Sequence, residues 1–439
     1  MVWTLRQDYL YDKHIHRHFR FNLVEPLIIS ILFLISIPSV GTLAAVTVVA
    51  SLFLIATNRR GAGAVKSLLF ITARSILSTG VASNYGDISM LKWTVVFALS
   101  AYCFLTGLKY ADRKTRKVIR SLAVFGIALI VIGFYTSGYP VTSAFKVFSW
   151  LFVFAAVILC VSANPRVDWI KYLSFYLAAL MLFSPVALPM GVAFLRNGHA
   201  FQGIINHPNL LGVISALCFT VQLYLEKREH KVWHIVLMAL CIVECWFTES
   251  RTGMFSIVII FIMNVLLSSE KGAKRNTMIL LLVVVSVVFS LTILGNENSA
   301  INRFIYKGHS DILYSRFGQV DTALERFENN PLFGSGFMTP LNPFGKNYEL
   351  DFDLIFEPGN LIYELLGDLG IVGTIWFALI YLRLYRLTEK QDRVLFAAPF
   401  VISMGEMIFF STNNIAIFYY LLFAVCIAGH KKPLLQTEG

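Results

Sequence analysis

The chain has 439 residues, of which 57% are hydrophobic and only 14% are charged, and its mean hydropathy is +0.68. Soluble domains contain roughly a quarter charged residues, so this composition excludes a soluble protein. The formal net charge of +11 could indicate nucleic-acid binding. In a membrane protein a basic excess reports orientation instead, and we therefore expect no nucleic-acid partner.

The apolar residues form about fourteen runs, most of 16 to 22 residues. A helix of that length crosses roughly 30 Å of hydrocarbon. The sequence therefore predicts an all-α, polytopic integral membrane protein with about 12 to 14 transmembrane helices, in one domain over residues 1–439. The predicted spans are 23–38, 41–57, 64–82, 92–108, 120–136, 145–163, 169–190, 209–225, 232–248, 253–268, 277–294, 360–382, 394–411 and 415–429.

The third of these spans differs from the others in the charges that it carries. It contains Lys66 and Arg74, and such charges are costly inside a bilayer. We expect either a true span or an interfacial or re-entrant helix at 64–82.

Basic clusters set the expected orientation. Residues 1–21 are polar and basic without a small-residue cleavage site, so we expect no cleavable signal and a first helix that anchors the chain. With the N-terminus in the cytoplasm, the short basic loops all fall inside, as the positive-inside rule requires. Both termini are then predicted to be cytoplasmic. The basic segments are 6–20, 59–60, 109–120, 166–171, 227–231, 271–275, 383–393 and 431–432.

Cysteine and histidine patterns give no sign of a metal site. All six cysteines lie inside apolar runs without C-x-x-C spacing, which indicates buried packing. The alternating His14, His16 and His18 of the basic tail are most simply surface residues. We predict no cofactor and no metal site.

Residues 295–359 form the longest predicted outward-facing loop, with nine acidic and five basic residues. A loop of this length is usually functional or disordered, and its helical periodicity argues against disorder. A helix is predicted over Tyr314–Phe327, with Phe317, Val320, Leu324 and Phe327 on its apolar face and Arg316, Gln319 and Arg326 on another. We expect it to end at Asn329, Asn330 and Pro331.

The first polar motif, Gly203 to Gly212, lies at the outer end of a predicted span and contains His207, Pro208 and Asn209. A simple helix start, in which Asn209 caps the free N–H groups after Pro208, explains it. Alternatively, the half-exposed helix N-terminus binds an anion or a hydroxyl group.

The second motif is Glu249 to Gly253, a short outer link between two apolar helices. Arg251 either extends to the headgroups or has an anionic partner. A pyrophosphate would suit its planar guanidinium, which binds phosphate oxygens bidentately.

The third and fourth motifs flank the end of the large loop. The first of these, Pro331 to Phe337, contains a Gly-Ser-Gly turn, and the second runs from Glu357 to Gly373. Glu364 and Asp368 are spaced i, i+4 and share one face of an apolar helix. They either favour the helix start electrostatically or serve a site. Asp351 and Asp353 have a D-x-D spacing that could hold a divalent cation, but such triplets are common.

Together these outer segments resemble the O-antigen ligase and polymerase superfamily of bacterial surface polysaccharide assembly. The similar patterns are G-x-x-x-H-P-N-x-x-G at Gly203 to Gly212, S-R-T-G at Ser250 to Gly253, R-F…N-P-L-F-G-x-G at Arg316 to Gly336, and a form of H-N-x-x-x-E-x-x-x-x-x-G-x-x-G at Gly359 to Gly373. The resemblance covers about residues 200 to 375, while the first half of the chain offers only hydropathy.

Two departures from the family pattern favour its polymerase branch. Ligase-type members usually carry His where this chain has Gly359. An Arg is also expected shortly before the first motif, where this chain has Ala200, and Arg196 could substitute for it.

The resemblance implies transfer of a growing glycan from an undecaprenyl pyrophosphate carrier to an acceptor sugar hydroxyl, on the outer face of the bacterial cytoplasmic membrane. The expected partners are the undecaprenyl pyrophosphate-linked oligosaccharide, membrane lipid and a separate chain-length regulator. Fixed arginines would stabilise the leaving pyrophosphate, and a carboxylate or imidazole would activate the hydroxyl. The candidates are Arg251 and Arg316 for the pyrophosphate with Arg196 and Arg303 in support, Glu357 as base followed by Glu364 and His207, and Asn209, Asn360 and Tyr363 for sugar hydroxyls.

A transporter of lipid-linked sugar or another solute is the competing class. Broken helices and intramembrane charges would suit it. The polar motifs gather on the outer face instead, and no inverted repeat is evident. We therefore prefer an enzyme, with the ligase as the alternative to the polymerase.

Overall fold

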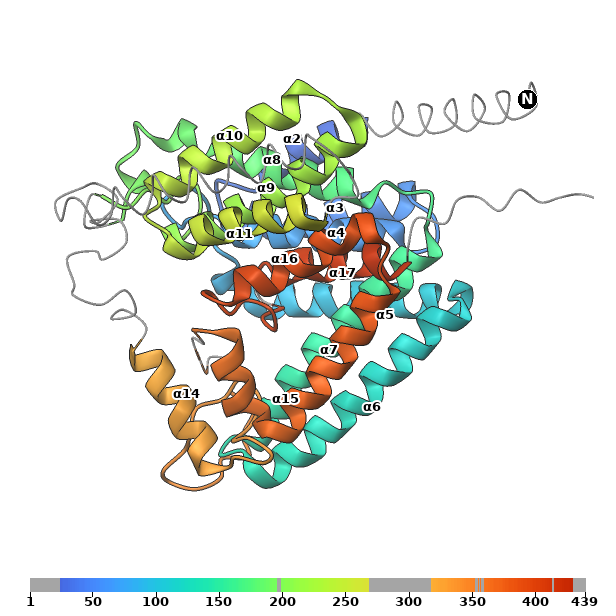
Figure 1. Cartoon of the computed structure of the whole chain (residues 1–439). Helices are drawn as coiled ribbons and strands as arrows, with labels where there is room; N and C mark the ends of the chain where they lie inside the picture. The colour runs from blue at the N-terminus through green and yellow to red at the C-terminus, as the bar shows by residue number, and fades with distance from the viewer. Residues whose placement is uncertain are drawn as a thin grey trace, which may run out of the picture.

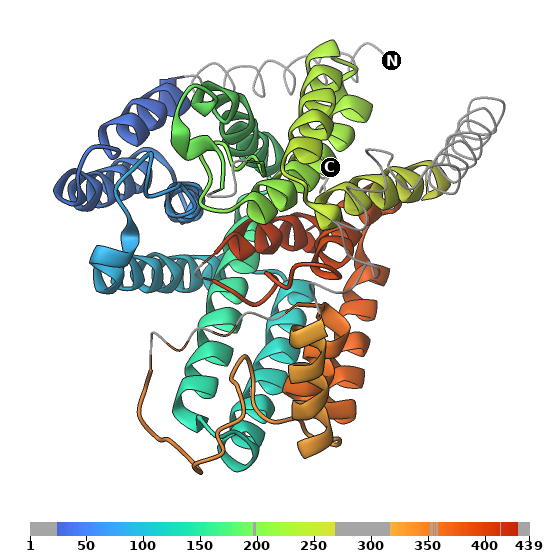
Figure 2. The same ribbon diagram turned by 90° about the vertical axis from the view of Figure 1, so that its left-hand side faces the viewer.

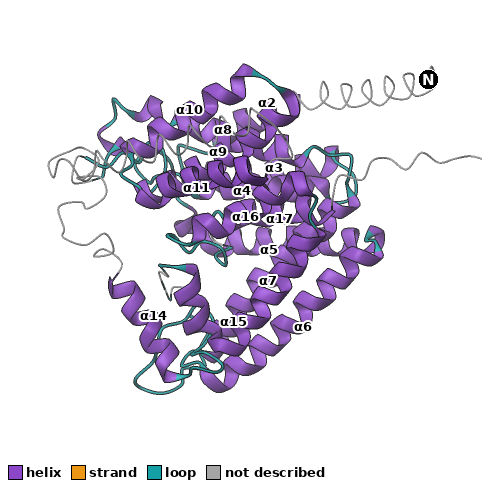
Figure 3. Ribbon diagram, in the orientation of Figure 1, coloured by secondary structure: helices purple, strands orange, loops and turns teal. Residues whose placement is uncertain are grey.

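The computed structural model describes residues 24–195, 199–267, 317–351, 354, 356, 359–412 and 414–428. Over these residues every regular element is helical, and β pairing is limited to the isolated bridges Leu77–Ile205 and Phe194–Phe201. Figure 3 shows this helical architecture, in which a long described loop lies beside α14 and α15. The protein is an all-α polytopic membrane protein, as predicted.

The described α-helices follow the hydropathy of the chain closely. They are α2 (Val24–Ile35), α3 (Val40–Thr57), α4 (Ala62–Ser75), α5 (Ser89–Tyr110), α6 (Arg113–Thr136), α7 (Pro140–Ala163), α8 (Trp169–Phe183), α9 (Pro208–Glu229), α10 (Val232–Phe247), α11 (Arg251–Leu267), α14 (Phe317–Asn329), α15 (Leu361–Leu387), α16 (Arg393–Ser403) and α17 (Ala416–Ala428).

The helices form two groups. Figure 1 shows α6, α7 and the longer part of α15 as inclined helices, below a group that contains α2, α3, α4 and α8 to α11. Figure 2 shows from the side that α14 lies against α15, next to the α6–α7 pair. α7 joins the groups, because it packs on α4 of the upper group as well as on α6.

Among the described residues, seven helical segments are long and apolar enough to cross a membrane, and four shorter apolar helices accompany them. Of the other three predicted spans, 64–82 and 394–411 correspond to α4 and α16, whereas 277–294 lies outside the described residues. Large apolar side chains such as Leu105 and Val232 are more than 70% exposed, as is usual for a lipid-facing surface.

The predicted span 64–82 corresponds to α4, which is a buried core helix too short to cross a membrane. Its 14 residues rise only about 21 Å, and all but the last are buried. Lys66 lies 2.7 Å from Glu25 Oε1 of α2, donates to Asn58 Oδ1 (2.6 Å) and lies 4.0 Å from the centre of the Tyr172 ring. The Tyr172 hydroxyl donates to Glu25 as well. One buried cation thus connects α2, the end of α3, α4 and α8.

Arg74, the second charge of α4, is buried too. Its Nε donates to Ser36 Oγ at 2.7 Å, and its Nη2 donates to the Ser36 and Ser83 carbonyls. The guanidinium therefore satisfies carbonyls of the two loops that follow α2 and α4.

The predicted span 394–411 is wrong in its second half. α16 ends at Ser403, and residues 404–415, called here the 404–415 loop, connect it to α17. Pro399 lies inside α16, and Gly405 and Glu406 follow its end. Proline and glycine both weaken a helix, but they do not lower the mean hydropathy of the run.

α15 is interrupted at Gly370, whose φ of 62° and ψ of −171° are not helical. Only glycine adopts this backbone conformation readily. The break gives α15 a short first part that carries Glu364 and Asp368 and a long second part that ends at Leu387.

We expect Lys66→Met to lower the stability of the folded protein strongly. The variant leaves the buried Glu25 carboxylate without its cation, and breaking such a pair costs about 3–5 kcal/mol. Thermal unfolding of the purified protein in detergent measures the change. The matched control is the double variant Glu25→Gln with Lys66→Met, which removes both charges and should recover much of the loss. A single variant as stable as the double variant would contradict this account.

Candidate active site

The segment before α9 is held by backbone pairing with the loop that follows α4. The Ser78 N–H donates to the Ile204 carbonyl (2.8 Å), and the Asn206 N–H donates to the Ile76 carbonyl (3.0 Å). α9 then begins at Pro208. This pairing fixes the direction in which the first motif enters its helix.

His207, rather than Asn209, caps α9. The Asn209 N–H donates to His207 Nδ1 at 3.2 Å, so the predicted capping by Asn209 is wrong. The residue before a proline is restricted to extended backbone, and His207 has φ −154° and ψ 140°. Its ring therefore takes the capping position and leaves the Asn209 amide available for another contact.

The first and second motifs touch at their glycines. A Cβ on Gly253 would approach the Gly212 carbonyl oxygen to 2.5 Å, and a Cβ on Gly212 would collide with the Ser250 side chain. Ser250 Oγ accepts the Gly253 N–H at 3.2 Å, just inside α11. The starts of α9 and α11 therefore lie side by side, with the half-buried Arg251 at the first position of α11.

The 404–415 loop connects these two motifs to the fourth. Asn209 Nδ2 donates to Glu406 Oε1 at 2.9 Å. A Cβ on Gly405 would collide with the Thr252 side chain, and Asn360 Nδ2 donates to the Met404 carbonyl at 2.5 Å. Three consecutive residues of this loop thus contact the three motifs.

The third motif reaches the same loop through aromatic side chains. The Phe337 ring stacks on Trp150 of α7, with ring centres 5.3 Å apart and an interplanar angle of 13°. Phe410 of the loop lies 4.5 Å from Trp150 and 5.0 Å from Phe337, between ring centres. All four motifs therefore meet the 404–415 loop.

Asn360 and Tyr363 lie at the start of α15. Asn360 caps this helix, because its Oδ1 accepts the Ile362 and Tyr363 N–H groups at 2.9 and 3.5 Å. Both ends of its amide are thus engaged within the protein. Tyr363 is 39% exposed, which leaves its side chain accessible.

Glu364 belongs to a buried ionic cluster with Arg326 of α14 and Asp368. Arg326 is fully buried, lies 2.9 Å from Glu364 Oε2, forms an ion pair with Asp368 and donates to the Gly336 carbonyl at 2.9 Å. Its guanidinium also lies 4.5 Å from the centre of the Phe356 ring. The Gly359 N–H donates to Glu364 Oε1 at 3.3 Å. Both carboxylate oxygens of Glu364 are therefore engaged inside the protein.

This cluster reverses the predicted face of α14. Ala323 and Arg326 are its buried residues, whereas Phe317 and Leu324 of the predicted apolar face are exposed. The predicted helix end is confirmed, since α14 ends at Asn329. A buried acidic pair requires a cation, and this requirement outweighs the burial of a leucine.

Backbone contacts align the third and fourth motifs. The Ser335 N–H donates to the Gly367 carbonyl (2.9 Å), and the Ile371 and Val372 N–H groups donate to the Pro331 and Leu332 carbonyls (2.9 and 3.1 Å). The last two donors are free for this purpose because the break at Gly370 removes their helical partners. A Cβ on Gly334 or Gly370 would collide with the facing backbone.

Gly359 occupies a position with little room for a side chain. A Cβ there would lie 2.6 Å from Oε1 and 3.0 Å from Cβ of Gln319 on α14. Gln319 therefore fills the space that a side chain at this position would require.

The structure describes six of the ten predicted site residues and places them near the starts of three helices. Arg251, His207, Asn209, Asn360, Tyr363 and Glu364 all lie at or near the starts of α9, α11 and α15. Glu357, Arg316, Arg196 and Arg303 lie outside the described residues.

Two residues of this region were missed by the sequence analysis. Glu406 lies inside a predicted span, and an acidic residue next to a glycine there signals a break in the helix. Arg326 is predicted on a different face from the apolar residues of its helix, although the buried Glu364–Asp368 pair indicates that a cation must come from another element. In the described part of the chain, no three His, Cys, Asp or Glu side chains form a potential metal site.

A comparison with protein families finds a match for part of the chain. Residues 235–378 match the family model described as O-antigen ligase. This range contains the second, third and fourth motifs, from Arg251 to Gly373. No curated protein matches the chain.

We expect Arg326→Gln to detach α14 from α15. The variant leaves Glu364 and Asp368 buried without a cation, at a cost of about 3–5 kcal/mol. Thermal unfolding and limited proteolysis of residues 330–351 measure this effect. The triple variant Arg326→Gln, Glu364→Gln, Asp368→Asn should restore protease resistance, and Arg386→Gln, at an exposed arginine of the same α15, serves as control. Equal behaviour of Arg326→Gln and Arg386→Gln would contradict the proposed role of the cluster.

Proposed function

We propose that the protein is a polysaccharide polymerase of the O-antigen ligase and polymerase superfamily, and the match of residues 235–378 to the family model described as O-antigen ligase supports this proposal. It transfers a glycan from an undecaprenyl pyrophosphate carrier to a lipid-linked repeat unit. The proposed location is the outer face of the bacterial cytoplasmic membrane. A separate chain-length regulator is a further expected partner.

The meeting of the four motifs at the 404–415 loop carries this proposal. Asn209, Thr252, Phe337 and Asn360 come from four distant parts of the chain and contact residues 404–410. Glycosyl transfer between two lipid-linked substrates needs binding groups for a phosphate donor and a sugar acceptor in one place. The half-buried Arg251, Asn209 and Glu406 supply a cation, an amide and a carboxylate there.

Arginines take the donor pyrophosphate in this proposal. The bond between the anomeric carbon and the pyrophosphate oxygen breaks, and the pyrophosphate leaves with the electron pair. Arg251 and Arg316 stabilise the charge that develops on it, with Arg196 and Arg303 in support. Arg251 suits this role because the start of α11 adds the partial positive charge of a helix N-terminus.

A carboxylate takes the proton of the acceptor hydroxyl as its oxygen forms the new bond to the anomeric carbon. Glu357 is the first candidate from the sequence. Glu406 is a second candidate, because it is half-buried and held by Asn209 at the meeting point of the motifs. His207 and Tyr363 are proposed to orient sugars, whereas the amide of Asn360 and both oxygens of Glu364 are engaged within the protein.

The family match supports ligase activity as well as it supports polymerase activity. Our preference for the polymerase rests on Gly359, where ligase-type members usually carry His. The packing of Gln319 against Gly359 supports it, since a side chain at this position would require Gln319 to move.

We expect the purified protein to convert its synthetic undecaprenyl pyrophosphate repeat unit into a ladder of longer products. Gel or mass analysis resolves the products by length, and a parallel reaction with EDTA tests Asp351 and Asp353 as metal ligands. Arg251→Ala and Arg316→Ala should abolish the long products at unchanged membrane protein level, because each removes a cation from the leaving group. Arg386→Gln serves as the control for a lost charge.

Each other outcome of this experiment has a defined meaning. Transfer only to a different acceptor, such as a lipid A core, would replace the polymerase by the ligase. No product from an authenticated substrate would overturn both activities. Normal product length in both arginine variants would remove Arg251 and Arg316 from the site.

Carboxamide variants distinguish the two candidate bases. If Glu357 is the base, Glu357→Gln should lower the turnover rate of the enzyme about 10²-fold or more, and if Glu406 is the base, Glu406→Gln should do so. General base catalysis contributes roughly that factor. The base variant should also flatten the acidic limb of the pH–rate profile. A positioning role for Glu406 predicts instead a raised KM with a retained pH profile, and partial rescue by Glu406→Asp. Wild-type kinetics in Glu406→Gln would exclude both roles for this residue.

A further inference from the structure

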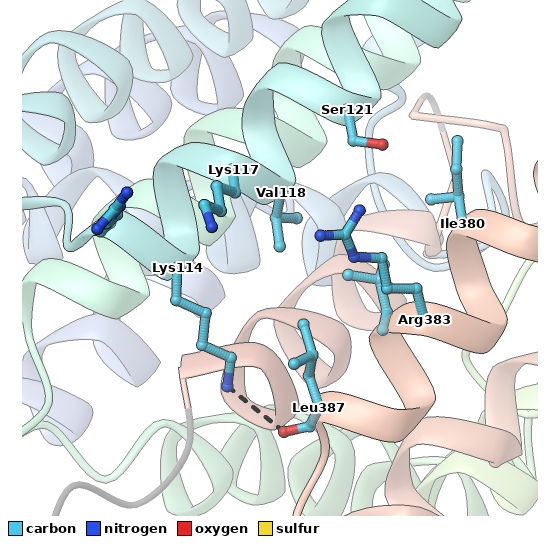
Figure 4. A pocket seen from close by; sticks show the side chains of 9 residues that line it. Lys114, Lys117, Val118, Ser121, Ile380, Arg383 and Leu387 are labelled. Atoms are coloured by element: carbon cyan, nitrogen blue, oxygen red, sulfur yellow. Dashed lines mark hydrogen bonds between the residues drawn. The ribbon is translucent and has the colours of Figure 1, made fainter.

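A pocket of about 350 Å³ lies between α6 and α15, at the opposite end of α15 from the ionic cluster. Figure 4 shows Lys114, Lys117 and Arg383 around it, with Val118 and Ile380 between the helices. From Gly370 to Arg383 the second part of α15 rises about 20 Å. The pocket is therefore remote from the candidate active site.

The polar lining of this pocket is strongly basic. Arg113, Lys114, Lys117 and Arg383 line it, and no acidic residue does. Lys114 donates to the Leu387 carbonyl at 3.4 Å. Over the described residues, the side chains of Arg113, Lys117 and Arg383 form no hydrogen bond or ion pair. Four cations around one cavity repel each other, and a bound anion removes this repulsion.

The acidic residues that flank α6 and α15 in the sequence do not line the pocket. Asp112 precedes α6 and caps it, since its Oδ1 accepts the Thr115 N–H at 2.8 Å. Glu389 follows α15 and accepts from Gln391 Nε2 at 3.0 Å. Neither residue lines the cavity.

The inner wall of the same pocket is apolar. Val118, Ile380 and Leu384 line it and are buried, and Leu387 extends it. Beyond Ser121, α6 continues with exposed apolar residues such as Ile127, and α15 does so with Ile375 and Leu379. A ligand with a phosphate group and a hydrocarbon chain fits this change from a basic to an apolar lining.

The charge pattern places this pocket at the headgroup level of the membrane. The first eight residues of α6 contain five basic side chains, and apolar residues follow. By the positive-inside rule this end of α6 faces the cytoplasm, where the leaflet is negatively charged.

We propose that this pocket binds an anionic phospholipid. Arg383 and Arg113 contact the phosphate through their planar guanidinium groups, Lys114 and Lys117 add point charges, and one acyl chain follows the surface between α6 and α15. The lipid connects the two helices at their cytoplasmic ends. This inference does not depend on the proposed function, because it concerns a different part of the molecule.

Native mass spectrometry of the purified protein tests the proposal, with phosphatidylglycerol and phosphatidylcholine supplied together. The protein should retain phosphatidylglycerol preferentially. Lys117→Gln with Arg383→Gln should weaken this binding on the order of twentyfold, since each basic residue near an anionic surface contributes roughly fivefold. The control is Arg116→Gln with Arg120→Gln, which removes two exposed cations of the same α6 end that do not line the pocket. This control variant should weaken phosphatidylglycerol binding by less than about twofold.

Three results would overturn the proposal. Equal retention of the two lipids would exclude a headgroup site. If the two double variants lost the same amount of phosphatidylglycerol binding, the lipid would be attracted by the overall charge of the protein rather than bound in the pocket. If inorganic phosphate displaced bound phosphatidylglycerol as effectively as free phosphatidylglycerol does, the pocket would be assigned to a soluble phosphate compound. Unchanged thermal unfolding of the variants without added lipid excludes misfolding, and polymer formation does not enter the measurement.

Discussion

A backbone that leaves helical geometry among membrane helices must find its hydrogen-bond partners within the protein. The 404–415 loop meets this requirement in part through its own turns, such as the Ile408 N–H to the Glu406 carbonyl (2.9 Å) and the Thr412 N–H to the Phe410 carbonyl (3.2 Å). The Met404 carbonyl is satisfied by Asn360 from another helix. Because the polar backbone groups of this short segment need hydrogen-bond partners, distant parts of the chain come into contact with it.

The charged residues of the interior serve two different purposes. Lys66 and Arg74 sit where helices and loops must be joined, and each is surrounded by several acceptors. Arg326 instead holds a helix of the large loop against the membrane helices through two carboxylates. Isolated charges would be unstable in such surroundings. Their pairing explains how a strongly apolar chain positions its polar segments.

Hydropathy predicts where most helices lie but not where they break. α3, α9 and α10 match their predicted spans within a few residues, because the length of an apolar run sets the length of a membrane helix. The breaks at Met404 and Gly370 escaped prediction. They depend on a few residues and on tertiary hydrogen bonds, and neither changes the mean hydropathy of a window.

The candidate site was predictable in its motifs but not in its contacts. The sequence identified Asn209, Arg251 and Asn360 as special, whereas Glu406 lay within an apparently continuous apolar helix. The assignment of the α9 cap to Asn209 failed because the restriction imposed by Pro208 acts on His207. Arg326 was misplaced because the helix pattern alone does not reveal two carboxylates on another element.

The backbone pairing of residues 331–335 with residues 367–372 determines where the protein can vary in length. Hydrogen bonds at Ser335, Ile371 and Val372 align the two segments residue by residue, so an insertion in either one would shift every later contact out of register. The intervening stretch around residues 342–348 carries largely exposed residues, including Phe344 and Tyr348. Loop segments of this kind accept inserted residues. New substrate-contacting surface could therefore be added there during evolution or engineering, while the aligned segments on either side stay unchanged.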